Sequence, residues 1–195
     1  MTVQEILDLV KLRLQNLIVV KDDTALISFI NLGVSTLYRK FNLSVKSETI
    51  TTTDDLALYE LRNQDVLLLL GVYDRSGREL QQTDTLGSNT YDYKIVNYRS
   101  FLLRKPRLDM LYAIYLAAPI PLKDPDDVID LPDAMLDALL IYIMYLAHTG
   151  INRDNVNESS FWYQKFLAAC NELEMEGYRI PLNIEMYPVQ SRGFV

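Results

Sequence analysis

Residues 126–150 read DDVIDLPDAMLDALLIYIMYLAHTG, and this stretch decides the fold. An acidic lead-in is followed by ten residues, Ala138 to Ala147, that are all apolar or aromatic. Pro132 suits the first turn of a helix, with Asp130 as its N-cap. A helix that is apolar all round must be covered on every side, and this one is too short to span a bilayer, which needs about 20 residues. We predict a central helix that shares surplus apolar surface with a second copy of the chain.

Composition indicates one globular domain of 195 residues. Acidic residues outnumber basic ones by 26 to 19, which argues against binding to a phosphate backbone as the main activity. One cysteine and one histidine exclude a disulfide framework and the usual zinc clusters. No basic segment precedes an apolar core at the N-terminus, so we expect no signal peptide. The 13 tyrosines suit surfaces that are dry on one side and polar on the other.

The first 42 residues predict two amphipathic helices joined as an antiparallel hairpin. Thr2 and Glu5 have the spacing of a capping box, and we expect the first helix to run for about 17 residues. Asp22 and Asp23 end that helix and cap the next. The apolar stripes of the two helices follow helical spacing: Ile6, Val10, Leu14 and Leu17 in the first, and Leu26, Ile30, Val34, Leu37 and Phe41 in the second.

Residues 43–122 predict a β-rich insertion between helices. The extended runs are SVKSETITT (44–52), ALYELR (57–62), VLLLLGVY (66–73), RELQQ (78–82), YKIVNYRSFLLRK (93–105) and LYAIYLAAP (111–119). Asp74 to Gly77 forms a polar turn that ends in glycine, and a second turn is expected around Pro106 and Asp109. Residues 66–70 lack clear alternation, so a helix is the alternative there. A loose loop is expected over residues 81–92.

The last third of the chain predicts the remaining bundle helices and an arm. Residues 123–178 hold the central helix and a further helix, which begins at a capping-box-like pair, Asn155 and Glu158, and stops at Gly177. Its packed face carries Trp162, Phe166, Ala169, Cys170 and Leu173. Residues 179–195 contain two prolines and no helical period, so we expect an extended arm. The predicted class is therefore α+β: a bundle of two N-terminal and two C-terminal helices, a central antiparallel β insertion and an extended C-terminal arm.

Residue types that often carry chemistry have structural interpretations in this chain. The acidic pairs at 22–23, 54–55 and 126–127 precede predicted elements, where capping explains them. His148 lies in the last turn of the central helix, where a cation suits the helix dipole, and Cys170 lies on a packed face. A basic cluster, interleaved with Tyr98 and Phe101, is interpreted as a solvated hairpin or a subunit contact: Arg99, Arg104, Lys105 and Arg107. No nucleotide-binding loop or nucleophile elbow is present, so we expect no enzyme, cofactor or metal site.

The order of these features resembles that of phage head-to-tail adaptor proteins. The residues that carry the resemblance are YLAAP at 115–119, DVIDLP at 127–132, the apolar run at 138–147 and FWYQKFLAAC at 161–170. The hairpin sequence GVYDRSGREL, residues 71–80, is also similar to a hairpin of that family. The long insertion and the tyrosine content depart from the pattern and leave open which ring of a connector the chain forms.

The resemblance implies a virion protein of the neck between capsid and tail, present in the host cytoplasm during assembly. Such adaptors form a homo-oligomeric ring, usually twelve-fold, that binds the portal protein, extends the DNA channel and docks the next tail or connector protein. An acidic lumen would let DNA pass without sequence-specific binding, and no membrane contact is expected.

Three sets of contact residues follow from this interpretation. We expect the helices to form the ring wall through Leu139, Tyr142, Tyr145, Trp162 and Phe166. We expect the hairpin at Asp74 and Gly77, with the basic turn at Arg104 and Arg107, to dock the tail. The arm is expected to reach the portal or a neighbouring subunit through its apolar side chains: Ile180, Leu182, Ile184, Met186, Tyr187 and Phe194.

Two alternatives remain open on the sequence. A tail-completion or other connector ring protein would show the same physical features. A small-molecule binding module or enzyme would instead use the arginine-rich hairpin and the acidic DPDD loop at 124–127.

Overall fold

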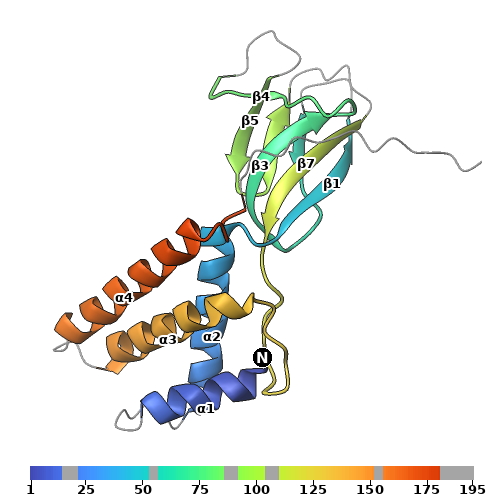
Figure 1. Ribbon diagram of the computed structural model, residues 1–195. Helices are drawn as coiled ribbons and strands as arrows, with labels where there is room; N and C mark the ends of the chain where they lie inside the picture. The colour runs from blue at the N-terminus through green and yellow to red at the C-terminus, as the bar shows by residue number, and fades with distance from the viewer. Residues whose placement is uncertain (15–21, 53–56, 86–91, 104–109, 152–155, 181–195) are drawn as a thin grey trace, which may run out of the picture. The chain divides into compact units, whose positions relative to one another are not determined.

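A computed structural model describes residues 1–14, 22–52, 57–85, 92–103, 110–151 and 156–180 (Figure 1). The chain forms two compact units. The helical unit contains Met1–Leu43 and Pro119–Ile180, and the β unit contains Ser44–Ala118. The predicted α+β class, with helices and a central insertion of mainly antiparallel strands, is confirmed.

Helix α1, Val3–Arg13, begins at the predicted capping box. The Thr2 hydroxyl accepts a hydrogen bond from the Glu5 N–H (3.3 Å), and the Glu5 carboxylate accepts one from the Thr2 N–H (2.8 Å). The helix has 11 residues and ends at the C-cap Leu14, so the predicted length of 17 was wrong. Lys11 and Arg13 lie in its last turn, where they complement the helix dipole. The predicted apolar stripe is buried as far as Leu14, and Leu17 lies outside the described residues.

Helix α2, Asp23–Phe41, is capped by Asp22 as predicted. The Asp22 carboxylate accepts hydrogen bonds from the N–H groups of Thr24 (3.0 Å) and Ala25 (3.4 Å). All five residues of the predicted apolar face are buried. The helix ends where Asn42 takes a left-handed conformation with φ of 57°.

The antiparallel hairpin predicted for α1 and α2 was wrong. Figure 1 shows α1 lying across the N-terminal end of α2 instead of running alongside it. Two constraints explain this arrangement. The first turn of α1 is hydrogen-bonded to residues 125–127, and the long apolar face of α2 packs against the central helix α3, Leu136–Ile151.

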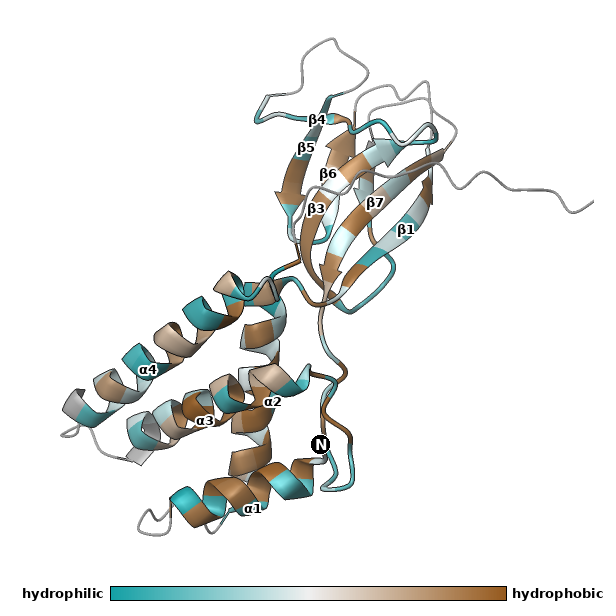
Figure 2. Ribbon diagram, in the orientation of Figure 1, coloured by the Kyte–Doolittle hydropathy of each residue, from teal (hydrophilic) through white to brown (hydrophobic). Residues whose placement is uncertain are grey.

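Helix α3 follows a short 3₁₀ turn, η2, Asp133–Met135. Pro132 occupies the N-cap position of η2 without a side-chain cap bond, so the prediction of Asp130 as N-cap was wrong. The Asp130 carboxylate instead accepts a hydrogen bond from the Tyr38 hydroxyl (3.0 Å). In Figure 2 hydrophobic residues dominate α2 and α3, whereas α4, Val156–Met175, alternates between polar and apolar.

The apolar surface of α3 is covered by its own chain. Of the ten residues from Ala138 to Ala147, six are buried and four are half-buried. Helices α1, α2 and α4 all contact α3. Three neighbours of the same chain therefore cover most of this helix, and the four half-buried residues keep part of its apolar surface accessible. That this remaining surface is shared with a second copy stays a prediction.

Helix α4 runs beside α3 and buries Phe166, Cys170 and Leu173 of its predicted face, while Trp162 and Ala169 pack at the edge of the same core. Gly177, with φ of 84°, ends the helix as predicted. Its N–H donates to the Glu174 carbonyl (3.1 Å), and the left-handed conformation favours glycine there. Asn155, the predicted start signal, lies outside the described residues.

The β unit contains two sheets within its described residues. The first has the order β1–β7–β3, from β1 (Val45–Thr51), β7 (Met110–Ala117) and β3 (Val66–Asp74), and is antiparallel. The second has the order β2–β6–β5–β4, from β2 (Ala57–Glu60), β6 (Ser100–Leu103), β5 (Asp92–Asn97) and β4 (Gln81–Gln82). Only β4 and β5 pair in parallel among these strands.

The strand predictions need two corrections. The run at 93–105 is not one strand: a tight turn at Tyr98 and Arg99 divides it into β5 and β6, because the Asn97 carboxamide accepts the Arg99 N–H (2.9 Å). The run at 78–82 forms only the two-residue strand β4 and a bridge between Glu79 and Tyr73. Residues 66–70 are a strand, as the primary prediction held. The turn at 106–109 and the loop at 86–91 lie outside the described residues.

The close approach of α2 to α3 predicts a sensitive position at Gly33. A Cβ atom there would lie 2.6 Å from Cδ1 of the buried Leu139. We expect Gly33→Val to lower the free energy of unfolding of the helical unit by about 1–3 kcal/mol through overpacking. Denaturant unfolding should measure it, with Leu32→Val at the neighbouring exposed position as the matched control. Equal effects of the two substitutions would contradict tight packing at Gly33.

Candidate partner-binding surfaces

Residues 119–131, here called the strap, connect the last β-strand to the central helix and are fixed by the N-terminus. The N–H groups of Val3 and Gln4 donate to the carbonyls of Asp127 (2.9 Å) and Pro125 (2.8 Å). The Ile129 N–H donates to the Met1 carbonyl (3.0 Å). These bonds pair the strap with the start of α1 like a short antiparallel ladder, so its backbone is held in place.

Helix α2 holds the strap from another side. The Asn31 side-chain amide donates to the Leu122 carbonyl (2.8 Å) and its oxygen accepts the Leu122 N–H (2.8 Å). This pair of hydrogen bonds satisfies the backbone N–H and carbonyl of Leu122, as a neighbouring strand would. Further along the strap, the Asp127 carboxylate accepts the N–H groups of Lys123 (2.7 Å) and Asp124 (3.0 Å). These bonds lower the pKa of Asp127. Asp127 therefore closes a turn of the strap. The prediction that it caps the following element was wrong.

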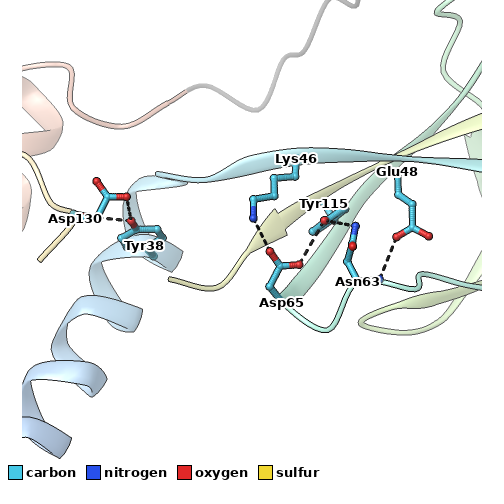
Figure 3. Close-up of polar contacts among 7 residues, drawn as sticks. All are labelled: Tyr38, Lys46, Glu48, Asn63, Asp65, Tyr115 and Asp130. Atoms are coloured by element: carbon cyan, nitrogen blue, oxygen red, sulfur yellow. Dashed lines mark hydrogen bonds and ion pairs between the residues drawn. The ribbon is translucent and has the colours of Figure 1, made fainter. Parts of the chain in front are cut away.

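Tyr38 makes the third attachment (Figure 3). Its hydroxyl donates at 2.9 Å to the Asp130 carbonyl or at 3.0 Å to the Asp130 carboxylate. Burial, which has the larger effect, and the hydrogen bond to Asp130 together raise the pKa of Tyr38 to about 12. The strap is thus tied to both α1 and α2 along its length.

The strap borders a cavity of about 370 Å³ within the helical unit. The lining comes from Val34 of α2 and from residues 119–124 and 127–130. Two aliphatic side chains of this lining point into solvent: Ile120 is 88% exposed and Val128 is 68% exposed. Burial of the intervening Leu122 and Ile129 fixes the backbone that presents them. A cavity with mainly apolar walls, flanked by exposed aliphatic residues, is a typical protein-binding feature.

The predicted interface residues of α3 and α4 divide by burial. Leu139 and Phe166 are buried in the helical core, whereas Tyr142, Tyr145 and Trp162 are half-buried. An aromatic chain links these helices, with ring centroids 4.7 Å apart for Tyr142 and Phe166 and 5.1 Å for Tyr145 and Tyr163. An interface on this face therefore depends on the half-buried members and their exposed neighbours.

The exposed neighbours lie on α4 and were missed in the sequence. Phe161 is 53% exposed and Tyr163 is 40% exposed. The Lys165 ammonium lies 4.6 Å from the centroid of the Phe161 ring and 5.2 Å from that of Trp162. The i, i+4 spacing of Phe161 and Lys165 could have revealed this ridge, here called the α4 ridge.

The single histidine and cysteine serve packing. His148 stacks on Trp162 with ring centroids 6.0 Å apart, and its Nδ1 lies 3.1 Å from a carboxylate oxygen of Glu158. Cys170 is buried, and burial raises the pKa of its thiol to about 11. A protonated, enclosed thiol is a poor nucleophile.

The predicted tail-docking turn is present in the β unit. The Asp74 carboxylate accepts the N–H groups of Ser76 (2.8 Å) and Arg78 (3.0 Å), and Gly77 has φ of 83°. Burial alone would raise the pKa of Asp74. The hydrogen bonds from these two N–H groups and from the Ser76 hydroxyl together outweigh burial, so the pKa of Asp74 is lowered. Asp74 therefore shapes the turn, and Arg75 and Ser76 are exposed at its tip. Arg104 and Arg107 lie outside the described residues.

A polar network stabilises one end of the first sheet (Figure 3). Lys46 pairs with Asp65 (2.6 Å), and the Tyr115 hydroxyl accepts from the Asn63 side-chain amide (2.8 Å) and donates to Asp65 (3.4 Å). The Glu48 carboxylate accepts the N–H of Asn63 (3.3 Å). Each of these groups has a structural partner, so we assign the network to stability.

No group of three or more histidine, cysteine, aspartate or glutamate residues in the described ranges could hold a metal ion. Among the helices of those ranges, none is both long and apolar enough to cross a membrane.

Comparison with known proteins then decides the family. Residues 1–186 match the family described as SU10 adaptor protein. The chain belongs to the SU10 adaptor protein family. No curated protein matches it. The SU10 adaptor family is a family of phage structural adaptors and not a known enzyme family, so the resemblance to phage adaptors is confirmed at this level.

The Tyr38 attachment yields a prediction with a defined pH window. The pKa of Tyr38 is raised from its ordinary value near 10 to about 12, so the folded chain favours the neutral phenol. This contribution to the free energy of unfolding is fully present below pH 10 and is lost as the pH rises from 10 to 12. We expect Tyr38→Phe to lower the free energy of unfolding by about 1 kcal/mol at pH 7, and to remove part of the loss above pH 10. Urea unfolding at both pH values measures this difference. An unchanged alkaline loss in Tyr38→Phe would contradict the assignment.

Proposed function

We propose that this SU10 adaptor family member forms a homo-oligomeric ring, of twelve copies, between the portal and the tail of a bacteriophage. The observation that carries the proposal is the family match over residues 1–186, which includes both the helical and the β unit. The ring would extend the DNA channel of the portal and provide the platform for the next tail or connector protein. Its site in the virion would be the neck, after assembly in the host cytoplasm.

The charge of the chain supports passage of DNA without retention. With 26 acidic and 19 basic residues, the subunit carries a net charge of −7. Twelve such subunits would surround the channel with a negative field, and like charges repel the phosphates. DNA would slide through the lumen with no sequence-specific contact.

Two segments of the subunit are proposed to meet different partners. The turn from Asp74 to Gly77 is rigid and polar, which suits docking of a tail component. The arm begins at Ile180, whose N–H donates to the Phe41 carbonyl (3.1 Å) and whose carbonyl accepts from the Asn42 side chain (3.0 Å). The sequence beyond this anchored point carries Leu182, Ile184 and other apolar residues, for which we propose the portal or a neighbouring subunit as partner.

Assembly on the portal tests the proposed function. We expect the purified chain, mixed with the portal protein of its own phage, to form a complex with one adaptor ring per portal ring. Native mass spectrometry gives the copy number, and electron microscopy shows the ring. Stable monomers that never associate with the portal would contradict the proposal.

Removal of the arm tests the proposed polarity. Truncation after Ile180 keeps the hydrogen bonds of that residue to Phe41 and Asn42, so the helical unit should unfold at the same temperature within a few degrees. We expect portal binding to be lost, since the apolar residues proposed to contact the portal are removed. Substitution of Arg75 and Ser76 by alanine, the matched control, should leave portal binding intact and weaken tail attachment. The reverse pattern would show that the polarity is inverted.

A further inference from the structure

Two surfaces of the helical unit suggest how one subunit could hold the next. The cavity beside the strap exposes Ile120 and Val128, and the α4 ridge exposes Phe161 and Lys165. Figure 1 shows the strap on one side of α2 and α4 on the other. Two different surfaces on opposite sides of a subunit are what a head-to-tail contact requires, and such contacts form a ring when the rotation from one subunit to the next closes.

The size and lining of the cavity fit an aromatic side chain. A cavity of about 150 Å³ with apolar walls is enough to hold a benzene ring in another protein, and the cavity here measures about 370 Å³. Its apolar walls include Val34 and Val128. Phe161, which is 53% exposed, would lose its contact with water in such a cavity.

The charges of the two surfaces are complementary. The strap carries four aspartates and one lysine: Asp124, Asp126, Asp127, Asp130 and Lys123. The α4 ridge carries Lys165, which is exposed and lies over the Phe161 ring. An aromatic residue with a cation beside it would therefore enter an apolar cavity with an acidic rim. Aromatic anchors in desolvated pockets, with charges at the rim, are typical of the energetic centre of an interface.

We propose that the α4 ridge of one copy docks into the strap cavity of the next, with Phe161 in the cavity and Lys165 against Asp124. This inference rests on the proposed ring and adds the contact that closes it. The attachments of the strap to α1 and α2 form the cavity within a single chain, so little reorganisation is needed on docking. The occupant is a second copy of the chain, and binding of a portal segment in the same cavity is the competing outcome.

Charge exchange tests the pairing of Lys165 with Asp124. We expect Lys165→Glu to weaken ring assembly on the portal by at least about tenfold, and Asp124→Lys to weaken it similarly. The double variant should recover most of the loss, because the pair is restored with its signs exchanged. Lys94→Glu, at an exposed position of the β unit, is the matched control and should have little effect. Additive losses in the double variant would overturn the pairing.

Cross-linking tests the position of Phe161. Val128→Cys combined with Phe161→Cys should give a ladder of covalent oligomers under mild oxidation of assembled rings, while each single variant should not. Cys170 can stay in place, because its buried thiol has a raised pKa. Portal-bound rings without a ladder would overturn this inference but leave the proposed function standing. Absence of rings for the unmodified chain, with or without portal, would overturn both. A disulfide from Val128→Cys to a cysteine placed in the portal would identify the portal as the occupant and overturn the inference.

Discussion

The helical unit depends on covering one helix that has no polar face. The run from Ala138 to Ala147 offers water no side to solvate, and a ten-residue apolar surface left open would associate nonspecifically. Helix α2 approaches so closely at Gly33 that any side chain there would meet Leu139, while α4 contributes Phe166 and Cys170 to the same core. The four-helix arrangement follows from this requirement, and it is met within one chain.

The strap makes that packed core the support of a candidate binding surface. Its inward residues, Leu122 and Ile129, complete the helical core, and this burial leaves Ile120 and Val128 pointing outward. Hydrogen bonds from Asn31 and Tyr38 fix the backbone between them. Stability and the proposed partner binding therefore depend on the same segment, and a substitution that loosens the strap should affect both.

Local signals in the sequence were enough for the elements but not for their arrangement. The capping box at Thr2 and the cap at Asp22 marked two helix starts, because each is formed by neighbouring residues. The crossing of α1 and α2 was missed, because it depends on bonds from Val3 to the distant Asp127. Asp130 was misread as a cap for the same reason: its partner, Tyr38, lies 92 residues away. The β5–β6 turn was missed because Asn97 supplies its bond without a glycine or proline to announce it.

Sequence-based prediction meets the same limit at the candidate binding surfaces. Leu139 and Phe166 were predicted at an interface because both are large and apolar, but periodicity does not tell a core face from a contact face. The strap cavity could not be predicted at all, since it exists only where residues 119–130 fold back over Val34. The resemblance to phage adaptors predicted the family, whereas no single residue indicated it.

Hydrogen exchange of the free chain and of the portal-bound chain tests the central claim most directly. We predict that backbone amides of α3, residues 136–151, already exchange slowly in the free chain, because α1, α2 and α4 of the same chain cover this helix. Binding should then slow exchange mainly in the strap and in the first half of α4. Fast exchange along α3 in the free chain, slowed only in the assembled ring, would contradict the claim that one chain suffices to cover this helix.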